Sequence, residues 1–188
     1  MTTKPRSRKV TVESTVTRHE LLVEGSDAAF RQFVHDTLAL SARLQQVRSQ
    51  LGQVIGLSGT QYTVLIAIAH LREMDEKVGV NLVAEHLHFS GAFITIEITK
   101  LVAAGLVEKE TDSEDRRRVV LGITPKARAL LNELTPVQRP ANDLLFSCLS
   151  AKDFSKIRKL MSALVGTADQ AIGLLEYTTP IAAARSAK

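Results

Sequence analysis

The segment NLVAEHLHFSGAFITIEITKLVAAGLVEKETDSEDRRRVVLGIT, residues 81–124, begins with two short helical patterns separated by a turn. Asn81 is a good N-cap for the first helix, and Ser90 opens a turn before a second helix over about residues 92–104. Gly105 ends that helix as a left-handed cap. Two short helices joined by a tight turn, the second apolar along one face only, indicate a helix-turn-helix. The residues of that face are Ile94, Ile98, Leu101 and Val102.

The remainder of the segment alternates apolar and polar residues on both sides of a charged turn. LVEKET, residues 106–111, and RVVLGIT, residues 118–124, flank the sequence DSEDRR, so the two runs are expected to pair as a β-hairpin. Three consecutive arginines follow Glu114 and Asp115 in this turn. An isolated turn of this kind is usually solvated. Behind a helix-turn-helix, it favours contact with nucleic acid.

Helical patterns flank the segment on both sides. Apolar residues recur every three or four positions over residues 27–51, after Ser26 or Asp27 as a cap. Ser58 and Gln61 then have the spacing of a capping box, and the helix they open is apolar on nearly all sides, so we expect it at the centre of the core. Downstream helices begin after Thr124 and Ser150. The apolar stripe of the last one is Phe154, Ile157, Leu160, Met161, Leu164, Val165, Ala168 and Ile172.

Composition limits the class of protein. The 188 residues are 45% apolar and 23% charged, which is enough for a packed core. The excess of 24 Lys and Arg over 20 Asp and Glu attracts polyanions mildly. The lone Cys148 excludes an internal disulfide and a multi-cysteine zinc site, and its apolar surroundings predict a small core residue. No apolar run approaches the length of a membrane span, and the N-terminus lacks the apolar part of a secretory signal, so a cytoplasmic protein with no membrane partner is expected.

The order of these elements, together with residues 81–124, resembles the MarR family of bacterial winged-helix transcription regulators over about residues 27–175. The most specific piece is Asp115-x-Arg117 followed by a strand that ends at Thr124. The resemblance implies a mainly α fold with a small β-hairpin wing, in which a winged helix-turn-helix joins N- and C-terminal dimerisation helices. Its expected regions are a basic flexible N-terminal tail (1–24), a helical dimerisation region (25–57 and 125–176), the winged helix-turn-helix DNA-binding domain (58–124) and a flexible C-terminal tail (177–188).

The resemblance also implies a function. A homodimer would bind double-stranded DNA at a near-palindromic operator, most simply as a repressor, and a small aromatic or anionic effector would release it. The first and last helices carry more apolar surface than the winged module could cover, which favours burial against a second chain. The arginine at position 117 would enter the minor groove, steadied by the aspartate at 115. The expected DNA-binding residues are Arg117, Arg116, Arg118, Asp115, Ser90, Ala92, Thr95, Thr99 and Lys100.

The second helix of the helix-turn-helix departs from the family pattern. Ile96 stands where family members often have a basic residue, and Glu97 stands where they often have an apolar one. The Glu97 carboxylate would repel the duplex unless it accepts from a cytosine amino group or pairs with Lys100. More of the affinity is therefore expected from the wing, the helix ends and the basic tail.

The architecture of this family places effectors between the dimerisation helices and the winged domain. The candidate pocket residues in this chain come from the first two helices, with Arg43 or His35 as polar contacts. They are Phe30, Phe33, Val34, Arg43, Leu65 and Ile68.

Three other function classes compete with this one. The sequence has no Gly-rich phosphate loop and no nucleophile elbow, so neither an enzyme nor a cofactor is expected. Five histidines could serve a metal-sensing regulator, yet no spacing requires it, and His86 and His88 project in different directions on a helix. A winged module that binds proteins instead of DNA is the third alternative, and the arginines of the hairpin argue against it.

Overall fold

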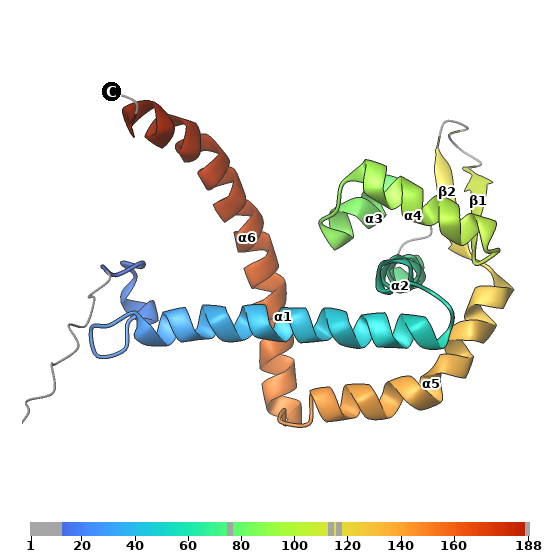
Figure 1. Cartoon of the computed structure of the whole chain (residues 1–188), viewed down its shortest axis with the longest axis horizontal. Coiled ribbons are helices and arrows are strands. Elements are labelled where there is room, and N and C mark those ends of the chain that lie inside the picture. The colour runs from blue at the N-terminus through green and yellow to red at the C-terminus, as the bar shows by residue number, and fades with distance from the viewer. Residues whose placement is uncertain (1–12, 75–76, 113–114, 116–117, 187–188) are drawn as a thin grey trace, which may run out of the picture. The chain divides into compact units, whose positions relative to one another are not determined.

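The computed structural model describes residues 13–74, 77–112, 115 and 118–186, with side chains described up to residue 179. The chain forms two compact units, Met1–Thr135 and Pro136–Lys188. Helices dominate, and the two strands form one antiparallel hairpin, so the predicted fold class is confirmed. Figure 1 shows the elements, which are η1 (His19–Leu21), α1 (Ala28–Val54), α2 (Gly59–Met74), α3 (Val80–Leu87), α4 (Gly91–Ala103), β1 (Val107–Thr111), β2 (Val119–Ile123), α5 (Pro125–Leu145) and α6 (Ala151–Ser186).

Helix α2 is the centre of the first unit, as its apolar sequence predicts. It contacts α1, α3, α4 and β2, and in Figure 1 it is seen nearly end-on between α1 and the α3–α4 pair. The predicted capping box opens it: the Ser58 N–H donates to Gln61 Oε1 at 2.9 Å, and the Gln61 N–H donates to Ser58 Oγ at 3.1 Å. Its side chains supply much of the core, including Tyr62, Val64, Leu65, Ile68 and Leu71.

The junction of α1 and α2 is tight because glycines stand where the helices meet. A Cβ atom on Gly59 would lie 2.9 Å from the Cα of Ser49, which leaves no room for a side chain. Arg48 of α1 then ties the pair together, since its Nε donates to Thr63 Oγ1 at 2.9 Å and its guanidinium lies 5.4 Å from the Tyr62 ring centroid. Burial lowers the pKa of Arg48. Among the described residues no single helix is long and apolar enough to cross a membrane, and α1 and α2 pass that test only as a pair bent by 90°.

The predicted helix-turn-helix is confirmed, with a correction at its start. Helix α3 begins at Val80 with Gly79 as its N-cap, two residues before the expected cap at Asn81. Just before α3, the Val78 carbonyl accepts a backbone hydrogen bond from the Leu121 N–H of β2 at 2.8 Å. The turn begins at His88, whose φ of 53° ends α3, and Gly105 ends α4 with a φ of 70° as predicted.

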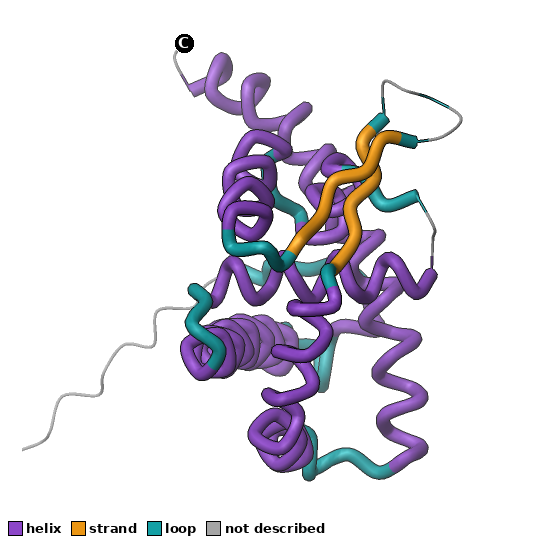
Figure 2. The backbone as a smooth tube through the Cα atoms, turned by 90° about the vertical axis from the view of Figure 1, so that its right-hand side faces the viewer, coloured by secondary structure: helices purple, strands orange, loops and turns teal. Residues whose placement is uncertain are grey.

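The two strands pair as predicted. Val107 lies opposite Ile123 and Thr111 lies opposite Val119, which fixes the register of the hairpin. Figure 2 shows the strands side by side. Val107 and Leu121 are buried, so the base of the hairpin is anchored in the core while its polar residues face outward.

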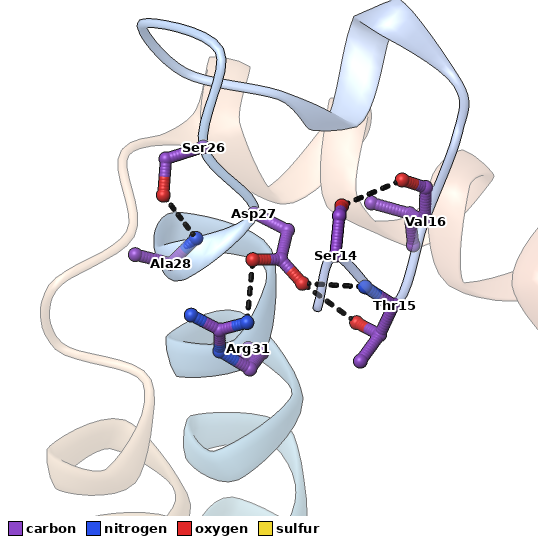
Figure 3. A network of polar contacts seen from close by, with 7 residues as sticks. All are labelled: Ser14, Thr15, Val16, Ser26, Asp27, Ala28 and Arg31. Carbon is purple, nitrogen blue, oxygen red and sulfur yellow. Dashed lines mark hydrogen bonds and ion pairs between the residues drawn. The ribbon is translucent and has the colours of Figure 1, made fainter. Parts of the chain in front are cut away.

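Part of the predicted N-terminal tail is folded instead. The backbone N–H and the hydroxyl of Thr15 both donate to Asp27 Oδ2 at 2.8 Å, and Arg31 of α1 donates to Oδ1 (Figure 3). The Asp27 side chain is only 4% exposed as a result. Residues from 14 onward therefore turn back onto the start of α1, and residues 1–12 lie outside the described part.

Replacing Asp27 by Asn should release this contact. The pKa of Asp27 lies below its ordinary value of 3.8, chiefly because the Thr15 N–H donates to the carboxylate. A lowered pKa means that the stabilisation is fully present above pH 3.8 and is lost as the pH falls through the lowered value. We expect the backbone amide of Thr15 to exchange with solvent faster in Asp27→Asn than in the parent protein. Protection of this amide should also no longer decrease at acid pH in the variant. NMR hydrogen exchange measures both effects. The exposed Asp36→Asn variant is the control, and equal protection in both variants would contradict the assignment.

The second unit contains the C-terminal part of α5 and the whole of α6. The expected cap of α6 is confirmed, because the Asp153 N–H donates to Ser150 Oγ at 3.2 Å and the Ser150 N–H donates to Asp153 Oδ2 at the same distance. The helix extends to Ser186, well past residue 176, where the sequence suggests its end. Cys148, expected in the core, is exposed between α5 and α6. This prediction was wrong because the apolar residues around it do not close over the loop.

Candidate nucleic-acid interface

Helix α4 has one face buried in the first unit and the opposite face open. Ile94 and Ile98 have no exposed surface and Leu101 has 1%, so they fix the rotation of the helix about its axis. Ile96, on the other side, is 54% exposed. The structure thus brings together the five predicted recognition residues on one surface, namely Ser90, Ala92, Thr95, Thr99 and Lys100, all of which are exposed.

The start of α4 is fixed by its cap. Ser90 Oγ accepts from the Phe93 N–H at 3.3 Å, so this hydroxyl is part of the helix end as well as of the open surface. Phe89 and Phe93 pack edge to face with ring centroids 5.2 Å apart, and both remain partly exposed. The first turn of α4 is therefore bordered by aromatic surface.

The structure decides between the two alternatives for Glu97. Its side chain is turned inward and is 6% exposed, and Lys100 Nζ lies 2.7 Å from its Oε1. The carboxylate is therefore paired within the helix and withdrawn from the open face. The same ion pair occupies the ammonium group of Lys100, which is the one cation of α4.

The two threonines of this face use their hydroxyl protons within the helix. Thr95 Oγ1 donates to the Gly91 carbonyl at 2.7 Å, and Thr99 Oγ1 donates to the Thr95 carbonyl at 2.8 Å. Neither hydroxyl can donate to a base or phosphate without breaking that bond. What the threonines present outward is a methyl group and an acceptor oxygen.

The described part of the wing is held by charged residues at the strand ends. Asp112 is buried, with Lys77 Nζ 3.4 Å from its Oδ1, and its N–H donates to the Arg118 carbonyl at 3.0 Å. The Arg118 N–H donates to the Asp115 carbonyl at 2.8 Å, and its Nε lies 3.5 Å from Asp115 Oδ2. Both side chains are exposed beside the strands. The two other predicted arginines, 116 and 117, lie outside the described residues.

The predicted pocket residues differ widely in burial. Leu65 and Ile68 have no exposed surface and belong to the core, whereas Phe33 and Val34 are exposed on α1. Arg43 is exposed and donates to the carbonyl of Ala39 on its own helix. The residue at 30 is half-buried near the start of α1.

A cavity of about 420 Å³ lies elsewhere, between the end of α2, β2 and the first half of α5. Its wall combines apolar side chains with two guanidinium groups, one carboxylate and one amide. No short motif could have indicated it, because Arg72 and Arg128 are brought together only by the fold. The lining residues are Ala69, Arg72, Glu73, Ile123, Arg128, Leu131 and Asn132.

Histidines meet at the contact of α2 and α3. The rings of His70 and His86 have centroids 5.8 Å apart. The pKa of His86 is lowered, first by burial and then by repulsion from His70 and His88. No group of three or more His, Cys, Asp or Glu side chains suited to a metal ion occurs within the described ranges. The histidines therefore add no support for a metal-sensing regulator.

The model of the MarR family matches residues 55–118, which begin just after α1 and contain α2, the helix-turn-helix and β1 of the wing. No curated protein matches the sequence.

Solved structures share the fold at low sequence identity. The MarR protein from Peptoclostridium difficile is 19% identical, covering 80% of this chain and 94% of its own, with a TM-score of 0.62. A MarR/EmrR family transcriptional regulator from Acinetobacter sp. is 17% identical, covering 74% and 96%, with a TM-score of 0.63. MepR of S. aureus in complex with DNA is 18% identical, covering 72% and 96%, with a TM-score of 0.58.

Proposed function

We propose that this chain, whose residues 55–118 match the MarR family model, binds double-stranded DNA as a homodimeric repressor released by a small anionic effector. The observation that carries the proposal is the placement of α4. One face of this helix is buried in the core, its opposite face is exposed to solvent, and a two-stranded wing follows it. An exposed helix held rigidly at a domain surface is the element that enters a major groove. The structure of MepR was solved with DNA bound to this fold.

The homodimer is supported by apolar surface that this chain leaves uncovered. Every described side chain of α6 from residue 151 to 179 is exposed, although the helix carries a continuous apolar stripe. A helix in water gains most of its stability from packing, so an uncovered helix of this length needs a partner surface. Helix α1 adds exposed apolar residues of its own, among them Phe33 and Leu38. A second copy of the chain supplies matching surfaces in a closed assembly.

The central experiment is the selection of bound duplexes from a random DNA pool at near-physiological salt, where non-specific binding is weak. The proposal requires enrichment of an inverted repeat whose half-sites lie about 10 bp apart, because two recognition helices related by a dyad are one helical turn apart. If no sequence is enriched although light scattering shows a dimer, the result would favour the alternative that the winged module binds proteins.

Replacing Arg117 by Ala should weaken operator binding by about 10- to 100-fold, the usual effect of losing one well-placed arginine contact. The residue itself lies outside the described part, and the expectation rests on its place in the wing and on the family resemblance. Fluorescence anisotropy with the selected duplex measures the change, and light scattering checks that the dimer persists. Arg118→Ala is the comparison variant: Arg118 is also an expected DNA-binding residue, but its side chain pairs with Asp115, so its loss should weaken binding less. If Arg117→Ala binds the operator as tightly as the parent protein, the assignment of the wing to the DNA interface is wrong.

We place the effector in the cavity lined by Arg72 and Arg128. Two guanidinium groups in a partly apolar pocket attract a small aromatic carboxylate, and no hydrogen bond or ion pair to another described residue occupies them. The cavity touches both α2, which packs against the helix-turn-helix, and α5, which continues into the second unit. A ligand that binds one arrangement of these helices more tightly shifts the population toward it.

This assignment is tested with benzoate as the probe. Titration calorimetry should show binding to the parent protein and about tenfold weaker binding by Arg128→Ala, because one charge-assisted hydrogen bond is lost. Arg43→Ala, on the exposed face of α1, should bind benzoate like the parent protein. Identical affinities for all three proteins would move the effector away from this cavity.

A further inference from the structure

The centre of the open face of α4 is formed by aliphatic groups. Helical residues are separated by about 100° around the axis, so four residues fall within about 60° of one another on the side opposite the buried Ile94. All four are exposed, and each presents a methyl group or an aliphatic side chain. They are Ala92, Ile96, Thr99 and Ala103.

The polar groups that normally read bases are missing from this face. The sequence of α4 contains no Arg, Asn or Gln, which are the side chains that form paired hydrogen bonds with guanine or adenine. Its single cation, Lys100, is paired with Glu97 at 2.7 Å. The hydroxyl protons of Thr95 and Thr99 are donated to backbone carbonyls of the helix. Bidentate hydrogen bonding cannot therefore be the source of sequence specificity on this helix.

The major groove offers one apolar group for such a surface, the C5 methyl of thymine. We propose that α4 selects A·T-rich half-sites by packing Ile96 and Thr99 against thymine methyl groups. The inference rests on the proposed DNA-binding function and adds the chemistry by which the site is chosen. Ile96 stays 54% exposed in the free chain, so contact with a methyl group would remove apolar surface from water on both sides.

Deoxyuridine provides a direct test, because it differs from thymidine only by that methyl group. The probe is a duplex enriched from the random pool, synthesised with deoxyuridine in place of thymidine within the half-sites. Each contacted methyl should contribute about fourfold to the affinity, the value for burial of one methylene-sized group. The control duplex carries the same number of deoxyuridines outside the half-sites and should bind like the original.

Two variants of one residue separate methyl from hydroxyl. Thr99→Ser keeps the hydroxyl and removes the methyl, so it should bind the thymidine duplex about fourfold more weakly. It should show no further loss on the deoxyuridine duplex, since both changes remove one contact. Thr99→Val keeps the methyl and should bind the thymidine duplex like the parent protein. Ile96→Ala should behave as Thr99→Ser does, with its loss confined to thymidine-containing half-sites.

The outcomes distinguish this inference from the function beneath it. A selected inverted repeat that binds equally well with deoxyuridine would overturn methyl readout and leave the DNA-binding function in place. If Ile96→Ala also binds that repeat normally, the apolar face of α4 belongs to a protein contact. Failure of the pool to yield any enriched duplex would remove the DNA-binding function itself, and methyl readout with it.

Discussion

Replacing Leu164 by Asp should convert the protein to a monomer and weaken operator binding at least about 100-fold. Leu164 lies in the exposed apolar stripe of α6, with 46% of its surface open in the single chain. In the proposed homodimer this surface is covered, and an unpaired carboxylate placed there would lose its hydration without compensation. When two separate monomers bind the two half-sites, the gain in affinity from linked binding is lost, and this gain is typically a factor of about 10² to 10⁴.

Sedimentation velocity measures the oligomeric state and anisotropy measures DNA binding. Ser162→Asp is the matched control, because it adds the same charge on the same helix but about 160° away from Leu164. This control should remain dimeric and bind DNA like the parent protein. A Leu164→Asp protein that stays dimeric at micromolar concentration would show that the α6 stripe is covered by something other than a second copy.

Replacing Ile98 by Ala should lower the free energy of unfolding by about 2–5 kcal/mol, the usual cost of removing most of a fully buried side chain. Ile98 has no exposed surface and holds α4 against the core of the first unit. Because domains of this size are stable by only about 5–15 kcal/mol, a large part of the molecules would unfold on mild heating.

Urea denaturation followed by circular dichroism measures this change. Ile96→Ala removes the same atoms from the open face of the same helix and should change stability by no more than about 0.5 kcal/mol. The two substitutions are expected to separate the two roles of α4, with Ile98 needed for folding and Ile96 for the choice of DNA. Similar losses of stability in both variants would contradict the assignment of the two faces.

The sequence by itself determined the elements and their order. Helical spacing of apolar residues located α1, α4 and α6, and strict alternation located the hairpin, because both periods depend on neighbours within a few positions. Caps were equally local. Ser58 with Gln61 and Ser150 with Asp153 each act across three residues, so residue type alone indicated them. The Ser90 cap of α4 was interpreted only as a turn, and the cap expected at Asn81 was wrong.

Only the tertiary structure decided which polar side chains pair with one another through hydrogen bonds or ion pairs. Glu97 and Lys100 are three residues apart, so their pairing was one of two alternatives until burial of Glu97 on the inner face settled it. Thr15 reaches Asp27 from 12 positions away, and that contact converts part of a presumed tail into a folded segment. Cys148, by contrast, sits among apolar neighbours in the sequence yet stays exposed.

The cavity shows the same limit most clearly. Its two guanidinium groups come from α2 and α5, which are adjacent only after β2 returns the chain to the end of α2. The first expectation combined Phe33 with Leu65, residues that the fold places on an open helix face and in the closed core. Periodicity states which side of a helix is apolar. Which partner covers that side depends on contacts between distant segments, and these form only when the whole chain packs.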